Sequence, residues 1–120
     1  MTVSRAKGAK AKADKYFSLI VRARGKCENC GSTANLQTMH VISRRYSRTR
    51  CDLRNAFCGC ARCHRWFTDN PLAFAEFVTD RLPSDDYDDL CQNARTMVKV
   101  DWDYEANRLQ TIWKTIEATA

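Results

Sequence analysis

The sequence predicts a small α+β domain that is held together by a structural metal ion. Two Cys-x-x-Cys pairs, Cys27/Cys30 and Cys60/Cys63, are separated by 29 residues. Between them, residues 35–42 alternate as a half-buried strand does, and amphipathic helical patterns lie on both sides of the two pairs. A chain of 120 residues can bury only a modest core, and domains of this size often need a metal ion or disulfides for stability.

Cysteine usage also bears on the compartment. The chain has seven cysteines, and an odd number argues against a complete disulfide framework. It has no apolar run long enough to span a membrane and no secretory signal pattern at its start. Paired Cys-x-x-Cys motifs in a reducing compartment are typical of metal sites, so we expect a cytoplasmic protein.

Taken in order, the chain begins with a basic segment, residues 1–10, that we expect to be a flexible tail. A single domain then covers residues 11–120. Within it, the pattern predicts an N-terminal helix over 11–25, a metal-bound core over 26–68 and helices over 69–120. The helix should pack its aromatic face on the core, with its lysines exposed, and Gly25 is a natural stop.

The core itself is expected to contain the strand at 35–42, an arginine-rich loop at 44–50 and a short second strand or turn at 53–57. A helix should follow Cys63 immediately. The later part of the chain predicts three more helices, at 71–82, 85–98 and 103–118.

Four thiolates in two Cys-x-x-Cys pairs suit tetrahedral zinc with no open position, which is the arrangement of structural sites. We assign Cys27, Cys30, Cys60 and Cys63 as the zinc ligands. Cys58 could replace one of them, but the repeated spacing favours Cys60 and Cys63. Of the other cysteines, Cys51 is expected to be a loop thiol and Cys91 a small buried apolar residue.

Charge is distributed unevenly along the chain, whose formal net charge is +6. Residues 1–26 hold eight Lys/Arg and one acid, residues 44–65 hold seven Arg and one acid, and residues 66–120 hold five basic and eleven acidic groups. A solvated surface is the common explanation of a charge run. Arginine, however, matches phosphate oxygens bidentately, which solubility does not require, so we expect DNA as the partner. The candidate DNA-binding residues are Arg44, Arg45, Arg48, Arg50, Arg54 and Arg62.

A possible catalytic set lies between and beside the cysteine pairs: His40 at the end of the strand, Asn55, and His64 directly after Cys63. An imidazole can accept the proton of an attacking water near neutral pH, and a divalent cation can neutralise a scissile phosphate. A ββα-metal nuclease site would supply both groups with few residues. His40 would be the general base, Asn55 would orient the loop or the imidazole, and His64 would hold a catalytic magnesium or manganese ion, distinct from the zinc.

Each of these residues also has a structural explanation. A single histidine on a strand is more often a satisfied core residue than a base, and a histidine after a knuckle can cap a helix or approach the zinc. The order Cys-x-x-Cys, His, Asn, Cys-x-x-Cys-His is what favours the functional interpretation.

Three stretches carry a resemblance to a known family: ADKYFSLIVRARGKCENCG, HVISRRYSRTRCDLRNAFCGCARCH and NPLAFAEF. They resemble the HNH (His-Me finger) endonucleases, and most closely the phage NinG/Rap recombination nucleases, over roughly residues 12–110. The resemblance implies a zinc-stapled ββα-metal core with flanking helices and a metal-dependent endonuclease of branched DNA such as Holliday junctions. It also implies the cytosol of a phage-infected or prophage-bearing bacterium.

Carried across by position, His40 matches the general base, Asn55 the central asparagine and His64 the metal contact of that family, while Arg44 and Arg54 match its phosphate-binding arginines. The departure is Met39, where many HNH enzymes have an acidic metal ligand, because a thioether does not suit a hard cation. Asp52 or Asp69 could supply a carboxylate instead.

Two alternatives to a nuclease remain. One is a zinc-dependent DNA-binding module without catalysis, and the other is a zinc domain that binds a protein through its acidic helices. Cleavage of two junction strands would need two sites, so the nuclease could form a homodimer. Trp113 and Ile116 could supply that interface, although core packing is the more common use of such residues.

Overall fold

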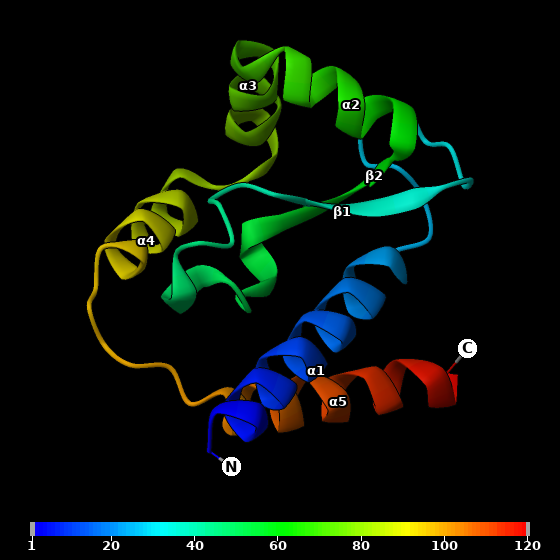
Figure 1. Cartoon of the computed structure of the whole chain (residues 1–120). Coiled ribbons are helices and arrows are strands. Elements are labelled where there is room, and N and C mark those ends of the chain that lie inside the picture. Colours follow the sequence, from blue (N-terminus) through cyan, green and yellow to red (C-terminus); the bar gives the residue numbers. More distant parts are fainter. Residues whose placement is uncertain (1, 120) are drawn as a thin grey trace.

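A computed structural model describes the backbone of residues 2–119 and the side chains of residues 8–119. Within these residues the chain forms five α-helices and one two-stranded antiparallel sheet (Figure 1), which confirms the predicted small α+β class. The elements are α1 (Thr2–Arg22), β1 (Leu36–His40), the 3-10 helices η1 (Ser47–Thr49) and η2 (Leu53–Asn55), β2 (Ala56–Cys60), α2 (Ala61–Asp69), α3 (Pro71–Arg81), α4 (Ser84–Ala94) and α5 (Trp102–Thr119).

The start of α1 differs from the prediction. The sequence suggests a flexible tail over residues 1–10, whereas α1 begins at Thr2; Met1 lies outside the described residues. Alanine and lysine recur between Ala6 and Lys12, and both are strong helix formers. The helix can therefore continue through the basic segment. The helices predicted at 71–82 and 103–118 lie close to α3 and α5, whereas α2 begins at Ala61, before Cys63, and α4 ends at Ala94 and does not reach residue 98. The expected strand or turn at 53–57 becomes η2 followed by β2.

The two faces of the sheet contact different helices. In the register of β1 and β2, Met39 is opposite Phe57 and His40 is opposite Ala56. Because side chains alternate along a strand, Met39 and Phe57 lie on one face and His40 and Ala56 on the other. The first face packs against α2 and α3, and the second packs against α1.

Helices α1 and α5 pack side by side below the sheet (Figure 1). Their shared core is built around Phe17, Val21 and Leu109, which are at most 2% exposed. Trp113 and Ile116 are partly buried against this core, as core packing predicts. None of the helices in the described part of the chain is both long and apolar enough for a membrane span.

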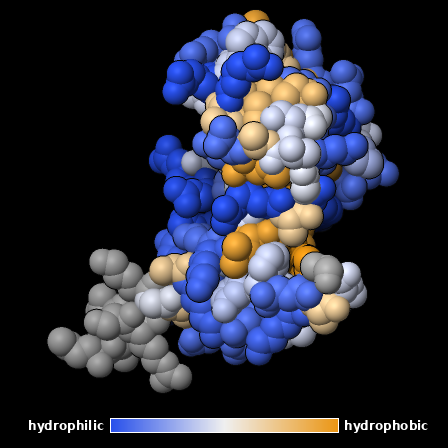
Figure 2. All heavy atoms as spheres, turned by 90° about the vertical axis from the view of Figure 1, so that its right-hand side faces the viewer, coloured by the Kyte–Doolittle hydropathy of each residue, from blue (hydrophilic) through white to orange (hydrophobic). Residues whose placement is uncertain are grey.

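The second core fills the space between the sheet and the helices α2 and α3. Its buried members are Met39, Phe57, Phe67, Phe77, Val78, Leu82 and Leu90. Figure 2 shows the resulting shape, an upper and a lower part joined by a narrower waist where apolar side chains reach the surface. The sheet therefore holds two helical layers apart and leaves the outer edge of β1 between them.

Candidate functional site

Four cysteine thiols from two distant parts of the chain meet at one point. The Sγ atoms of Cys27, Cys30, Cys60 and Cys63 all lie within 4.8 Å of one another, and those of Cys30 and Cys60 are 3.7 Å apart. Tetrahedral zinc with bonds of about 2.3 Å needs sulfur atoms at roughly this spacing. The cluster could therefore hold a structural metal ion such as zinc, as the two Cys-x-x-Cys pairs predict.

Local backbone geometry makes each pair converge. Gly31 has a φ of +81°, a conformation that costs glycine little, and its amide donates to the carbonyl of Cys27 at 2.9 Å. Cys60 ends β2 and caps α2, where its Sγ accepts a hydrogen bond from the amide of Cys63 at 3.4 Å. The amide of Cys30 donates to Cys27 Sγ at the same distance of 3.4 Å. Each knuckle therefore presents one sulfur to a backbone amide.

These hydrogen bonds favour thiolates at two of the four positions. Burial opposes ionisation of Cys27, but the backbone amides of Cys30, Cys60 and Asn29 together outweigh it and lower its pKa to about 6. The backbone amide of Cys63 lowers the pKa of Cys60. Burial raises the pKa of Cys63 to about 12, against the hydrogen bond from Asn29. Since metal ligation requires thiolates, binding at this cluster would release protons.

The other cysteines lie away from this cluster. Cys58 is fully buried in the core beside α1, so the four thiols that meet are the ones that the repeated spacing favours. Cys51 is also buried in that core, and burial raises its pKa to about 12. Cys91 is half-buried. Cys51 lies in the loop between η1 and η2, as the sequence predicts, and that loop folds back onto α1 and α5, where Arg108 donates to the carbonyl of Cys51 at 2.9 Å.

His40 lies at the end of β1 and faces α1. Its ring stacks on Phe17, with centroids 5.3 Å apart and planes at 19°. Its Nε2 atom is buried and has no hydrogen-bond partner among the described residues. Burial, followed by the positive charge of Arg44, lowers the pKa of His40 to about 4. The imidazole is therefore neutral at pH 7 and able to accept a proton.

His64 lies in the first turn of α2, on the other side of β1. Its Nδ1 forms a hydrogen bond of 2.7 Å with Oε1 of Gln37. Because an amide oxygen only accepts, Nδ1 must carry the proton. The lone pair is then on Nε2, and a histidine oriented in this way by a second hydrogen bond is a typical metal ligand.

Both histidines line one open cavity of about 770 Å³ at the outer edge of β1. Helix α1 supplies Asp14, Ser18 and Arg22 to its wall, and the loop after β1 supplies Ser43 and Arg44. The fold thus brings together two side chains that are 24 positions apart in sequence.

Asn55 holds the loop that follows His40. It is fully buried, and its Oδ1 accepts a hydrogen bond from the amide of Ile42 at 2.7 Å. Its Nδ2 donates to the carbonyl oxygens of Ile42 at 3.0 Å and Thr49 at 3.1 Å. The sequence predicts that Asn55 orients either this loop or the imidazole, and its hydrogen bonds go to the loop.

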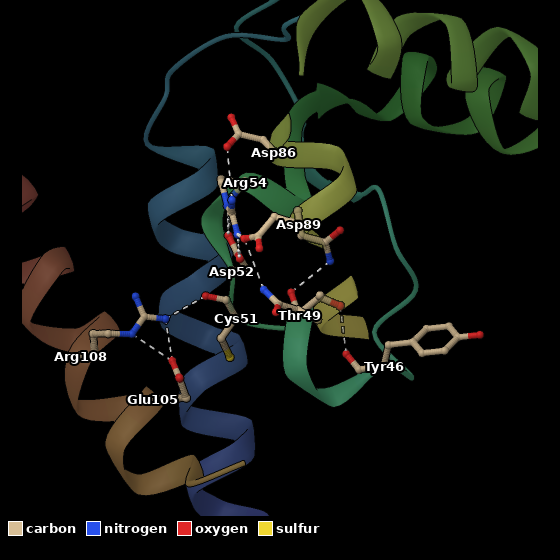
Figure 3. Close-up of polar contacts among 11 residues, drawn as sticks. Tyr46, Thr49, Cys51, Asp52, Arg54, Asp86, Asp89, Glu105 and Arg108 are labelled. Atoms are coloured by element: carbon tan, nitrogen blue, oxygen red, sulfur yellow. Dashed lines mark hydrogen bonds and ion pairs between the residues drawn. The ribbon is translucent and has the colours of Figure 1, made fainter. Parts of the chain in front are cut away.

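The six candidate arginines divide into two groups. Arg50 forms an ion pair with Asp14, with its Nε 2.8 Å from Oδ1. Arg54 contacts Asp52, Asp86 and Asp89 and so ties η2 to α4 (Figure 3). These carboxylates occupy the donors that we expected to bind DNA. The other four are exposed and take part in none of the ion pairs among the described residues; they are Arg44, Arg45, Arg48 and Arg62.

The carboxylates that could replace an acid at Met39 lie in different places. Met39 is 1% exposed in the core between the sheet and α2. Asp52 is paired with Arg54 and caps η2. Asp69 is exposed and lines a shallow cavity together with Gln37 and His64. Of the two acids considered, Asp69 is therefore the one beside His64.

Comparison of the chain with models of protein families, with curated proteins and with solved structures gives no match. The geometry of the site must therefore support its function by itself. Part of that geometry was not expected from the sequence: Asp14, Ser18 and Arg22 of α1 form a wall of the histidine cavity, and Phe17 of the same helix stacks on His40. The available signal was the i, i+4 spacing of Ser18 and Arg22 on one face of a helix whose aromatic side is predicted to meet the core.

Proposed function

We propose that this protein is a metal-dependent endodeoxyribonuclease of the HNH type, acting on duplex or branched DNA. The observation that carries the proposal is the convergence of His40, His64 and Arg44 on one cavity at the edge of a hairpin. The antiparallel hairpin and the helix α2 that follows it, next to four clustered cysteines, support a zinc-stapled ββα-metal core. Cleavage would leave 5′-phosphate and 3′-hydroxyl ends.

In this proposal His40 is the general base. Its Nε2 is buried, so Nδ1 is the ring nitrogen that would take the proton from the attacking water. The stacking of its ring on Phe17 fixes the imidazole plane and reduces the entropy that is lost when water and phosphate align. Its lowered pKa keeps the ring neutral at pH 7, although a more basic imidazole would remove the proton more strongly.

His64 and its surroundings fit a divalent cation that is shared with the substrate. The free lone pair of His64 and the carboxylate of Asp69, acting through water, are the protein donors on that side of β1. Magnesium commonly binds through one or two protein groups together with phosphate oxygens and water. A magnesium or manganese ion held there would neutralise charge on the scissile phosphate and the leaving 3′ oxygen.

The remaining residues position the strand. Asn55 fixes the loop backbone between Ile42 and Thr49 through its hydrogen bonds. That loop carries the exposed arginines Arg44, Arg45 and Arg48, which would contact phosphates. The cysteine cluster with zinc would hold β2 and the start of α2 in place, and so the spacing between His40 and His64.

A second candidate, a zinc-dependent DNA-binding module without catalysis, has one observation in its favour. Met39 fills the position where a metal-binding acid is expected, and it is buried in the core instead. The exposed arginines and the cysteine cluster would serve binding alone equally well. Binding without cleavage in the following experiment would select this candidate.

The test is cleavage of a labelled four-way junction and of a linear duplex with the same arm sequences, with magnesium, with manganese and with neither ion. Zinc content is measured in every sample, because a chelator strong enough to remove magnesium can also remove zinc. We expect cation-dependent nicking that falls by about 10²- to 10⁴-fold in His40→Ala, with DNA binding retained.

Several outcomes would alter the proposal in distinct ways. Equal cleavage of junction and duplex would keep the nuclease and remove the preference for branched DNA. Binding without cleavage at any cation concentration would reject the nuclease. Undiminished cleavage by His40→Ala would show that the activity comes from another site or from a contaminating enzyme.

A further inference from the structure

A second cavity opens on the other side of the two histidines. It has a volume of about 340 Å³, and His40, Ser43 and His64 line both this cavity and the larger one beside α1. We call it the apolar cavity, because its remaining walls are mainly hydrophobic. Those walls are formed by Met39, Val41, Phe67, Thr68, Pro71 and Phe74.

The two cavities have opposite chemistry. On the α1 side, Arg22, Arg44 and hydroxyl groups line the space, as a phosphate requires, and the carboxylate of Asp14, which also lines it, is paired with Arg50. On the α2–α3 side, Phe67 and Phe74 are in contact, with ring centroids 5.2 Å apart, and Thr68 is the one polar residue in the lining besides the shared His40, Ser43 and His64. The loss of water from apolar walls favours an apolar occupant, whereas a phosphate would lose its hydration there without compensation.

We infer that the apolar cavity receives an unpaired nucleobase next to the scissile phosphodiester. This inference rests on the proposed function and adds to it the feature of DNA that the enzyme selects. In DNA, the groups next to each phosphate are sugars and bases. Only a base has a large apolar face, so a base is the group that suits the apolar cavity. The cavity lies at the small end of ligand sites, which run from roughly 300 to 1,000 Å³, so it suits one base.

Phe74 is the residue best placed to stack with that base. It is half-buried on α3 and lines the apolar cavity, and it also lines a neighbouring apolar groove with Val41 and Pro71. Stacking on an aromatic ring is available to every base. The hydroxyl groups of Ser43 and Thr68 lie at the rim, where polar base edges would remain.

A base inside a duplex is stacked and paired, so it can enter such a cavity only after it leaves the helix. That step costs a few kcal/mol in paired DNA and least where the base is already unpaired. The cavity would therefore discriminate in favour of branch points, bulges and mispairs. Selection for branched DNA would then follow from this chain's own residues and not from its resemblance to a family.

The experiment uses the full chain and places 2-aminopurine, one position at a time, at each nucleotide that flanks the branch point of a four-way junction. Binding is measured with calcium in place of magnesium. Fluorescence should rise at one position on binding, because that base leaves the DNA stack. Cleavage of the junction is compared with cleavage of matched linear duplex as a ratio of kcat/KM values.

Two substitutions of Phe74 separate stacking from packing. Phe74→Leu keeps an apolar side chain against Phe67 but removes the aromatic face, and Phe74→Trp keeps an aromatic face. We expect Phe74→Leu to lower the junction-to-duplex ratio about tenfold and to reduce the fluorescence rise, while Phe74→Trp preserves both. Leu72→Ala is the matched control, since Leu72 is 82% exposed on the same helix and does not line the cavity.

An unchanged ratio and an unchanged fluorescence rise in a folded Phe74→Leu variant would overturn the inference. So would a wild-type protein that binds the junction with no rise at any position. If the wild type binds but cuts neither DNA, the proposed nuclease function fails, and the fluorescence comparison still decides whether a base enters the cavity.

Discussion

The cysteine cluster and the histidine cavity share β1, β2 and the start of α2, but they differ in how completely their polar groups are satisfied. At the cluster, three of the four sulfurs accept a hydrogen bond from a backbone amide or from Asn29. In the cavity, His40 Nε2 is buried with no partner among the described residues, and Arg44 is exposed.

If the proposed function holds, this difference separates a stabilising part from a functional part within one small domain. Buried polar groups without partners are unfavourable, so they persist where the surrounding structure holds them in place. A satisfied cluster at one end of the hairpin can hold an unsatisfied ring at the other end. Changes at the cluster should therefore affect folding, and changes in the cavity should affect chemistry with little loss of structure.

The largest effect is expected from loss of the cysteine cluster. Structural zinc contributes about 10–16 kcal/mol in small zinc domains, which is as large as the whole stability of an ordinary domain. Cys60→Ser should therefore abolish zinc binding and cooperative unfolding. The measurements are zinc content and thermal unfolding followed by circular dichroism.

Cys91→Ser is the matched control for that substitution, because Cys91 is half-buried and outside the group of four. It should keep its zinc and its unfolding transition. A folded Cys60→Ser protein with a normal transition would show that the cluster does not carry the fold, and the distinction between the two regions would fail.

The second prediction concerns Asn55, which holds the loop beside the histidine cavity but is as deeply buried as the cysteine cluster. Asn55→Ala would leave the amide of Ile42 and the carbonyl of Thr49 without their present partner. Each buried group that loses its partner costs about 1–3 kcal/mol, so we expect a loss of about 3 kcal/mol in the free energy of unfolding, measured with urea. Asn93→Ala should cost far less, since the side chain of Asn93 makes one long hydrogen bond of 3.5 Å on the surface.

The third prediction tests the proposed contacts of the exposed arginines with DNA. A plot of log affinity against log salt concentration has a negative slope. Replacing Arg44, Arg45 and Arg48 by Gln should make this slope shallower by about 3, because each phosphate contact contributes roughly 0.9 to its magnitude. The control replaces Arg95, Lys99 and Lys114, which are exposed and carry the same total charge. Equal slopes in the two triple variants would mean that net charge, and not this loop, drives binding.

The sequence is sufficient to predict the cluster because the information is local. Two Cys-x-x-Cys pairs specify two tight turns, and zinc chemistry then requires that the pairs meet. The helices could also be predicted, since the periodicity of α3 and α5 is visible along the chain. Asn55 was predicted to hold the loop or the imidazole from its place between His40 and His64 in the order of the motif.

The cavity could be predicted only in part because its walls come from distant segments. The pairing of Arg50 with Asp14 joins residues 36 positions apart, and the pairing of Arg54 with Asp86 joins residues 32 apart. Charge patterning along the chain cannot reveal such partners, so both arginines looked available for DNA. The same limit applies to Phe17, whose stacking on His40 depends on how α1 crosses the sheet.

The smallest expected effect tests whether His40 is held neutral at some cost to the fold. Its pKa is lowered from 6.5 to about 4, first by burial and then by Arg44. Between these values the unfolded chain binds more protons than the folded one, so stability must fall as the pH decreases from about 6.5 towards 4 and is unaffected above 6.5. Because the ring is partly exposed, solvent screening reduces the energetic effect of this pKa shift. We therefore expect the free energy of unfolding to fall by about 1 kcal/mol between pH 7 and pH 5.

Acid would also protonate the four clustered cysteines and weaken any zinc site that they form, so the effect of His40 is measured as a difference between two proteins. His40→Gln keeps a polar side chain of similar size and cannot titrate. Urea unfolding at pH 7 and pH 5 should show a smaller loss of stability in His40→Gln than in the wild type. Parallel losses would mean that the cavity solvates the imidazolium, and the contrast between a satisfied cluster and an unsatisfied histidine would then be weaker than the hydrogen-bond geometry indicates.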